Sequence, residues 1–383
     1  METNNEIVKV RPGKFLLKLT LFCLPIIIVL AFPLWVFYRS GELLSNDEMV
    51  ARLTSDSPVL IGTAYSNPVD YLFLQSTLIT EPDIVVIGSS RSGQLRSNFF
   101  KPGVKEITAY GFHKITHLRR FLEHVPAEKS PKVLMLGLDQ RFFSPNYYSP
   151  SIDNIDTLLT KPMPLQEIFA KWSQVYTDYF KGKFTLQELS NNSGSAVGML
   201  AIARGAGYRN DGSHDMGDIV ESPEDPKSND YQYKASLSFI DRGIEGFEYG
   251  QEISSGALSE LKSILSQAKE RNIYVVGFSP PFAPPVYEKI KSISDLAKYG
   301  YMSAIPATFK ALFDSYGFGY FNFTDPKSLN LTSAQFADGT HTTERGSLML
   351  LIKMIEADPT LKKYTDMNSL RARLQKASGE YDL

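Results

Sequence analysis

The longest apolar block of the chain lies near its start. It runs from Leu19 to Tyr38 (LTLFCLPIIIVLAFPLWVFY), 20 residues without a charge, and a helix of this length just crosses a hydrocarbon core of about 30 Å. Trp35 and Tyr38 lie at its far end, where interfacial aromatic residues gather. The block is preceded by four basic residues, Lys9, Arg11, Lys14 and Lys18. This pattern predicts an anchor that keeps the N-terminus in the cytoplasm and places the rest of the chain outside.

A cleaved signal peptide is the alternative interpretation of this block. The apolar stretch is longer than the core of a usual signal peptide, and no small-x-small cleavage site follows it within PLWVFYRSGE. We therefore expect residues 19–38 to remain as the span of a single-pass protein of the cell membrane.

Beyond the anchor, short apolar runs alternate with segments of helical periodicity. The runs are nearly continuous in apolar character, which is typical of strands buried on both faces of a parallel sheet; they are Ile84–Ile87, Val133–Leu136, Ile273–Phe278 and Tyr320–Phe323. Helical periodicity covers Lys114–His124, Gly256–Glu270 and Thr343–Glu356. This alternation predicts a doubly wound α/β fold.

The same pattern divides the chain into four parts. Residues 1–40 hold the cytoplasmic N-terminus and the anchor, 41–80 form a connector, 81–365 form the α/β domain, and 366–383 form a polar tail that we expect to fray. Residues 137–272, 136 in all, separate the second strand from the third, far more than an ordinary loop, so the domain carries an insertion at about 150–250.

The insertion itself has two kinds of sequence. Met163–Tyr179 and Thr185–Ala203 have helical patterns, whereas Gly205–Asp230 is poor in apolar residues and holds seven acidic and two basic residues. We interpret Gly205–Asp230 as a mobile, solvated excursion, with a substrate lid as the alternative.

Composition narrows the class of protein. Of 383 residues, 43% are hydrophobic and 21% charged, which is typical of a globular protein. The 40 basic and 42 acidic residues give a net charge of −2, which argues against a nucleic-acid partner. Cys23 is the only cysteine and lies inside the apolar block, so neither an internal disulfide nor a cysteine metal cage is available.

Cofactor and metal signals are weak. The sequence contains no glycine-rich phosphate loop and no dinucleotide fingerprint, so we expect no soluble cofactor. His113, His117 and His124 are spaced so that one helix face could carry all three imidazoles. No glutamate follows His113 and no outside ligand is indicated, so we predict a half-buried polar face and no metal.

The first candidate for chemistry follows the first predicted strand, where Ile87 leads into Gly88-Ser89-Ser90-Arg91. A hydroxyl at this point lies at the carboxyl end of a parallel strand, where open α/β sheets bind ligands. Backbone amides beside it can stabilise a developing oxyanion. The alternative is a serine-rich turn that only caps a helix.

The second candidate is Asp338-Gly339-Thr340-His341. A serine becomes a nucleophile when a base takes its proton, and that base needs an orienting acceptor. Three residues of separation allow the Asp338 carboxylate to reach the His341 imidazole. The alternative is a turn before a helix, with Asp338 as its cap and His341 incidental.

Together, Gly-Ser-Ser after the first strand and Asp-x-x-His before the last helix resemble the SGNH (GDSL-like) hydrolase superfamily. The match is closest to membrane-anchored SGNH-like proteins that modify cell-envelope polymers. Those include the teichoic-acid D-alanylation protein and the alginate and peptidoglycan O-acetylation proteins, several of which have one N-terminal span followed by Gly-Ser-Ser. The resemblance covers roughly residues 80–360 and implies a flavodoxin-like three-layer sandwich with a mainly parallel sheet.

The resemblance also implies a role for each residue of the two motifs. Ser90 would be the nucleophile, and His341 the general base and then the general acid. Asp338 would orient the imidazole and stabilise its protonated form.

The residues that would stabilise the oxyanion, here called the oxyanion side of the site, depart from the family pattern. Gly111, in Ala109-Tyr110-Gly111-Phe112, matches the glycine of the second block. The third block is normally Gly-x-Asn-Asp, but here Gly137 is followed by Leu138, Asp139, Gln140 and Arg141.

An ionised Asp139 would repel an oxyanion. Asp139 is therefore protonated or turned aside, with Gln140 or Arg141 donating instead, or the protein is not a standard esterase. Arg91 could hold an anionic group or pair with Asp139, and a plain salt bridge is equally compatible with the sequence.

These features predict a membrane-anchored, extracytoplasmic acyltransferase or esterase that moves an acyl group, acetyl being the expected one, to or from a cell-envelope glycan or teichoic-acid-type polymer. The resemblance implies a polytopic membrane O-acyltransferase as partner. The alternative from another class is a non-catalytic SGNH-like scaffold that binds a polymer or organises a membrane complex.

Overall fold

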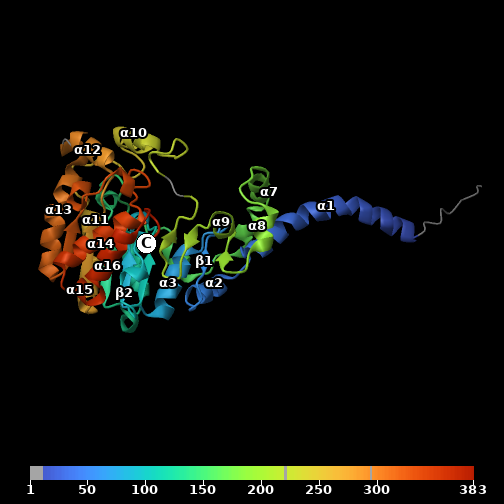
Figure 1. The fold of residues 1–383 in the computed structure, drawn as a ribbon, viewed down its shortest axis with the longest axis horizontal. Helices are drawn as coiled ribbons and strands as arrows, with labels where there is room; N and C mark the ends of the chain where they lie inside the picture. Colours follow the sequence, from blue (N-terminus) through green and yellow to red (C-terminus); the bar gives the residue numbers. More distant parts are fainter. Residues whose placement is uncertain (1–11, 220–221, 294–295) are drawn as a thin grey trace, which may run out of the picture.

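The computed structural model describes residues 12–219, 222–293 and 296–383 (Figure 1). Within these ranges the chain is an α/β protein with a parallel sheet and one long apolar helix at its N-terminal end, which confirms the predicted class. Lys9 and Arg11 of the predicted basic flank lie outside the described residues.

Five parallel strands form the central sheet in the order β3-β2-β4-β8-β9. Their bounds are Ile84–Ile87 (β2), Glu106–Ala109 (β3), Val133–Gly137 (β4), Tyr274–Ser279 (β8) and Gly319–Asn322 (β9). Four strands coincide with the predicted apolar runs to within one residue at either end. Every residue of β2, β3 and β4 is buried, as expected for a sheet covered on both faces.

The sequence pattern does not predict β3, because Glu106 and Thr108 interrupt its apolar residues. Both side chains are nevertheless in the core, at 3% and 0% exposure, and Thr108 Oγ1 donates to Glu106 Oε1 over 2.6 Å. Burial, with the nearby charge of Asp211, raises the pKa of Glu106 well above its usual value. A neutral carboxyl therefore fits the core position.

Helices cover the sheet. The predicted helices are present with ends shifted by at most one residue, as α4 (Ile115–His124), α11 (Ser255–Glu270) and α14 (Glu344–Ala357). Helix α11 packs between α4 and α13 (Leu296–Tyr316), and α3 (Val69–Thr80) packs on β3. The remaining helices of this part are α5 (Ile155–Thr160), α10 (Lys234–Arg242), α12 (Pro284–Ile293), α15 (Leu361–Tyr364) and α16 (Met367–Lys376).

The prediction that residues 366–383 form a frayed tail is wrong for most of this segment. Helix α16 packs on α14, and Leu370 is 2% exposed. The last residue is also held, because Leu383 N donates to Glu344 Oε2 over 3.1 Å and Arg96 donates to the Leu383 carbonyl over 2.6 Å. The polar composition of the tail therefore reflects salt bridges and hydrogen bonds rather than disorder.

A second, small sheet joins the 41–80 segment to the insertion. Its strands are β1 (Leu60–Ile61), β5 (Ala196–Val197), β6 (Gly207–Tyr208) and β7 (His214–Asp215), in the order β5-β1-β6-β7. Helix α2 (Asn46–Leu53) precedes it, and α9 (Met199–Arg204) follows β5. The predicted insertion helices are shorter than expected and divide into α6 (Leu165–Phe169), α7 (Trp172–Phe180) and α8 (Leu186–Asn191).

The interpretation of Gly205–Asp230 as a solvated excursion is wrong for its described first half. Ala206 is 2% and Ser213 0% exposed, because this part supplies two strands of the small sheet. Asp211 accepts hydrogen bonds from Ser97 and Ser213 instead of facing water. Residues 224–227 are exposed as predicted, and Asp230 is buried again at 5%.

Helix α1 (Pro12–Ser40) contains the predicted span and is long and apolar enough to cross a membrane. Figure 1 shows it projecting from the α/β body, with α7 and α8 beside its base. The predicted span, residues 19–38, reaches into the domain at its end, because Val36 and Phe37, like Ser40 beyond them, are fully buried. Phe37 packs edge-on against Tyr65 and Trp172.

Candidate active site

The two sequence motifs meet at the carboxyl end of the central sheet. Ser89 and Ser90 follow β2, Asp139 and Gln140 follow β4, and His341 lies on the loop before α14. Strand β2 has β3 on one side and β4 on the other, so the chain changes direction across the sheet between these strands. Open α/β sheets bind ligands at such a switch point.

Ser90, His341 and Asp338 form one continuous chain of polar contacts. Ser90 Oγ lies 2.7 Å from His341 Nε2, and His341 Nδ1 lies 2.7 Å from Asp338 Oδ2. The Ser90 side chain is exposed, so its hydroxyl can meet a substrate. The three residues that the sequence singled out are therefore brought together in hydrogen-bonding order.

The loop itself fixes Asp338. Its Oδ1 accepts from the backbone amides of Thr340 over 2.7 Å and His341 over 2.8 Å, so one carboxylate oxygen holds the loop while the other holds the imidazole. Burial opposes ionisation of Asp338, but the His341 charge and these hydrogen bonds outweigh it and hold the pKa of Asp338 below its usual value. Asp338 is therefore a carboxylate at neutral pH.

The pKa of His341 shifts in the opposite direction, upward. Burial disfavours the imidazolium, but the Asp338 charge and hydrogen bond outweigh that cost and raise the pKa of His341 above 6.5. A carboxylate at Nδ1 favours the tautomer that carries its proton there, which leaves Nε2 free to accept the Ser90 proton.

A second carboxylate, Asp230, supports the loop from the insertion. Asp230 Oδ2 accepts from the Gly339 amide over 2.9 Å and from Ser236 Oγ over 2.5 Å. A side chain on Gly339 would collide with Ser236, since a Cβ there would lie 2.3 Å from its hydroxyl oxygen. Sequence reasoning placed Asp230 in a solvated segment and missed this role, because the partner lies over 100 residues away.

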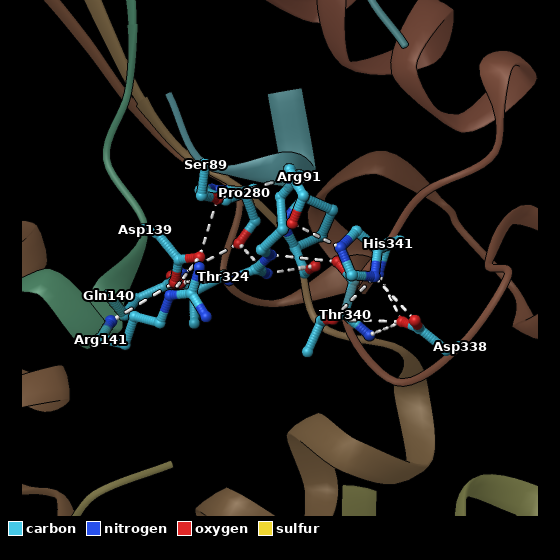
Figure 2. A network of polar contacts seen from close by, with 12 residues as sticks. Ser89, Arg91, Asp139, Gln140, Arg141, Pro280, Thr324, Asp338, Thr340 and His341 are labelled. Carbon is cyan, nitrogen blue, oxygen red and sulfur yellow. Dashed lines mark hydrogen bonds and ion pairs between the residues drawn. The ribbon is translucent and has the colours of Figure 1, made fainter. Parts of the chain in front are cut away.

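Arg91 is the most connected side chain of the site (Figure 2). Its guanidinium donates to Gln140 Oε1 (2.7 Å), to the Pro280 and Pro281 carbonyls (3.0 and 2.6 Å) and to the Thr340 carbonyl (3.0 Å). It also lies 3.2 Å from Asp139 Oδ1 and over the ring of Phe282. The side chain is 4% exposed. Of the two roles that the sequence left open, binding an anionic group and pairing with Asp139, the structure supports the salt bridge with Asp139.

Asp139 is ionised, and its carboxylate is engaged with Ser89, Arg91 and Arg141. Its Oδ2 accepts from Ser89 Oγ over 2.9 Å and lies 3.3 Å from Arg141 Nε, while Oδ1 faces Arg91. Burial raises the pKa of Asp139, but the Arg91 and Arg141 charges and the Ser89 hydrogen bond more than offset this and keep the pKa below its usual value. Of the possibilities left open by the sequence, protonation of Asp139 is thus disfavoured.

The other residues predicted for the oxyanion side lie in different places. The Gln140 amide nitrogen donates to the Pro280 carbonyl and to Thr324 Oγ1, both over 2.9 Å, so it is engaged away from Ser90. Gly111 adopts a left-handed φ of 89° and is not among the described residues that line the cavities beside Ser90. Arg141 does line the larger of those cavities.

Two cavities meet at Ser90, Asp338 and His341. The larger, of about 420 Å³, is lined by charged and polar side chains and by aromatic rings, among them Arg141, Asn229, Asp230, Glu245, Phe239 and Phe282. The smaller, of about 290 Å³, is more apolar and is lined by Tyr110, His214, Met216, Ile219 and Tyr381 among others. His214, Met216 and Ile219 belong to Gly205–Asp230, which therefore borders the site.

The histidines proposed as one helix face have separate partners. His113 precedes α4, His117 lies 3.8 Å from Asp153, and His124 Nε2 lies 3.0 Å from Asp156. Within the described residues, no three His, Cys, Asp or Glu side chains are grouped so as to hold a metal ion.

No protein-family model matches this chain, and no curated protein matches it either.

Removing the Arg91 charge should destabilise the fold, because the buried Asp139 would lose its Arg91 partner and keep only Arg141 as a counter-charge. We expect Arg91→Met to lower the free energy of unfolding at pH 7 by about 3–5 kcal/mol. Denaturant unfolding of the full chain in detergent measures this. Lys353→Met, which removes an exposed pair with Glu356, is the control and should cost less than about 1 kcal/mol. Equal effects of the two changes would contradict the role assigned to Arg91.

Proposed function

We propose that this protein is a membrane-anchored serine acyltransferase or esterase of the SGNH-like kind, acting outside the cytoplasm on a cell-envelope polysaccharide. The observation that carries the proposal is the unbroken contact chain from Ser90 through His341 to Asp338, which opens onto two cavities. The strand order adds support. Numbered along the chain, the five parallel strands run 2-1-3-4-5, the order of flavodoxin-like folds.

The reaction begins with acylation of Ser90. As Ser90 Oγ forms a bond to the acyl carbonyl carbon, its proton passes to His341 Nε2. The tetrahedral intermediate then collapses, the bond to the donor oxygen breaks, and His341 returns the proton to that oxygen. Asp338 remains a carboxylate throughout and stabilises the transient imidazolium.

Transfer to the acceptor repeats these steps in reverse order. An acceptor hydroxyl loses its proton to His341 Nε2 while its oxygen attacks the acyl-Ser90 carbonyl. Ser90 leaves as the tetrahedral intermediate collapses and recovers its proton from His341. A sugar hydroxyl as acceptor gives an acyltransferase, and water gives an esterase.

The two cavities suit two substrates that share one nucleophile. The polar cavity offers carboxylate, amide and aromatic groups to the hydroxyls and rings of a glycan or teichoic-acid-type polymer. The more apolar cavity suits the acyl group and its carrier. A polytopic membrane O-acyltransferase that exports the acyl group is the partner that fits this arrangement, with α1 as the membrane anchor.

The proposed nucleophile can be tested with a fluorophosphonate probe, which labels activated serines. We expect the wild-type chain to be labelled at Ser90 and Ser90→Ala to lose all labelling and all acetyl-ester turnover. Ser263→Ala, an exposed hydroxyl on α11, is the matched control and should behave as wild type. Circular dichroism checks that Ser90→Ala folds. Absence of labelling in the folded wild-type chain would support the scaffold alternative instead.

The His341–Asp338 pair predicts a definite pH dependence. The base must be neutral and its pKa is raised, so kcat/KM for an acetyl ester should rise with pH through a midpoint above 6.5. Asp338→Asn removes the charge that raises this pKa. It should move the midpoint to lower pH and reduce the rate roughly 10³–10⁴-fold.

The measurement is a pH–rate profile of both forms. Asp314→Asn, which removes an exposed carboxylate paired with Lys310 in α13, is the control and should leave the midpoint in place. A midpoint that Asp338→Asn does not move would contradict the assignment of His341 as the base.

A further inference from the structure

The surface beside the base of α1 exposes several large apolar side chains. Among the described residues outside α1, eight large apolar side chains are well exposed, and five of them lie between positions 165 and 200: Leu165, Phe169, Phe180, Leu186 and Leu200. Phe180 is 80% exposed, more than any other large apolar side chain of the described chain, those of α1 included. Exposed apolar side chains concentrated in one part of the chain in this way mark an interaction surface.

This surface is continuous with the apolar helix. Tyr176 and Tyr179 of α7 pack against Phe32 of α1, with ring centroids 5.3 and 5.2 Å apart, and Phe180 stacks on Tyr176. The Tyr176 hydroxyl donates to the Val29 carbonyl. Nearer the domain, Phe169 packs against Phe37. Helix α7 therefore lies along the last turns of α1 rather than apart from it.

The position of Val29 sets the depth of these contacts. Val29 is 11 residues before Ser40, which at the rise of an α-helix is about 16 Å from the domain end of α1. The hydrocarbon core spans about 30 Å. If α1 crosses the bilayer from Lys14 or Lys18, the membrane surface meets the helix near the level of α7.

Helix α7 cannot lie deep in hydrocarbon. Asp178 forms an ion pair with Lys183, and exposed Lys171 and Lys181 stand at the two ends of the helix. Aromatic rings with lysines beside them suit the boundary between acyl chains and headgroups, where anionic lipid attracts the lysines.

We propose that Phe169, Tyr176 and Phe180, named here the α7 patch, insert into the outer face of the bilayer beside α1. The outer membrane boundary then crosses α1 near Leu34, about 20 residues or 30 Å after Lys14, and the buried Val36, Phe37 and Ser40 belong to the folded domain. Two contacts with the bilayer, α1 and the α7 patch, fix the orientation of the α/β domain. This inference rests on α1 being the membrane anchor and is independent of the chemistry at Ser90.

The test uses the full chain with Cys23→Ser in nanodiscs of phosphatidylcholine and phosphatidylglycerol. A nitroxide is placed at Phe180→Cys, with Ile27→Cys as the membrane reference and Lys227→Cys as the aqueous reference. Relaxation by oxygen, which partitions into lipid, is compared with relaxation by a water-soluble nickel chelate. We expect the oxygen-to-nickel ratio at position 180 to approach that at 27 and to exceed that at 227 several-fold.

The two references separate the ways in which the inference can fail. If the oxygen-to-nickel ratio at position 180 equals that at 227 while the ratio at 27 is lipid-like, the α7 patch does not insert into the bilayer, and α1 remains the anchor. An aqueous ratio at 27 as well overturns both the patch and the anchor. Esterase activity at Ser90, measured on the same samples with a soluble ester, reports separately on the proposed chemistry.

Discussion

The buried guanidinium of Arg91 holds the site together. It is bonded to the residues after β4, to the proline-rich loop after β8 and to the loop that carries His341, while its own backbone follows the proposed nucleophile after β2. An almost fully buried charge is tolerated only when it is paired and its donors are satisfied. Asp139 supplies the charge, and three backbone carbonyls with Gln140 supply the acceptors. The relative positions of Ser90 and His341 depend on this one arrangement.

This constraint also explains the departure at the oxyanion side. The position that resembles a donor asparagine is an aspartate whose carboxylate is committed to Ser89, Arg91 and Arg141. It acts as the counter-ion of the guanidinium, and the adjacent Gln140 is committed to Pro280 and Thr324. The Ser90–His341–Asp338 contacts thus have the arrangement of a catalytic triad, whereas the Asp139 position is occupied by an ion pair.

Local patterns could be predicted from the sequence, and the long-range contact between Ser90 and His341 was expected only from the family resemblance. Other long-range interactions could not be predicted. The buried strands and the Asp338–His341 pair are local patterns, so their bounds and contact could be predicted. Strand β3 could not, because its Glu106 looks polar until its burial is known. Asp230 could not, because only the fold brings an acidic segment against the Gly339 amide. The alternatives for Asp139 likewise stayed open until both of its arginine partners were placed.

The most direct test of the central claim is to look for the covalent intermediate. The full chain is mixed with an isotopically labelled acetyl ester, quenched in acid during turnover and mapped by tandem mass spectrometry. Covalent catalysis by Ser90 predicts a labelled acetyl group on this residue that is depleted when an acceptor glycan is added before the quench. Turnover of the ester without acyl label on Ser90, or with label on another residue, would contradict it.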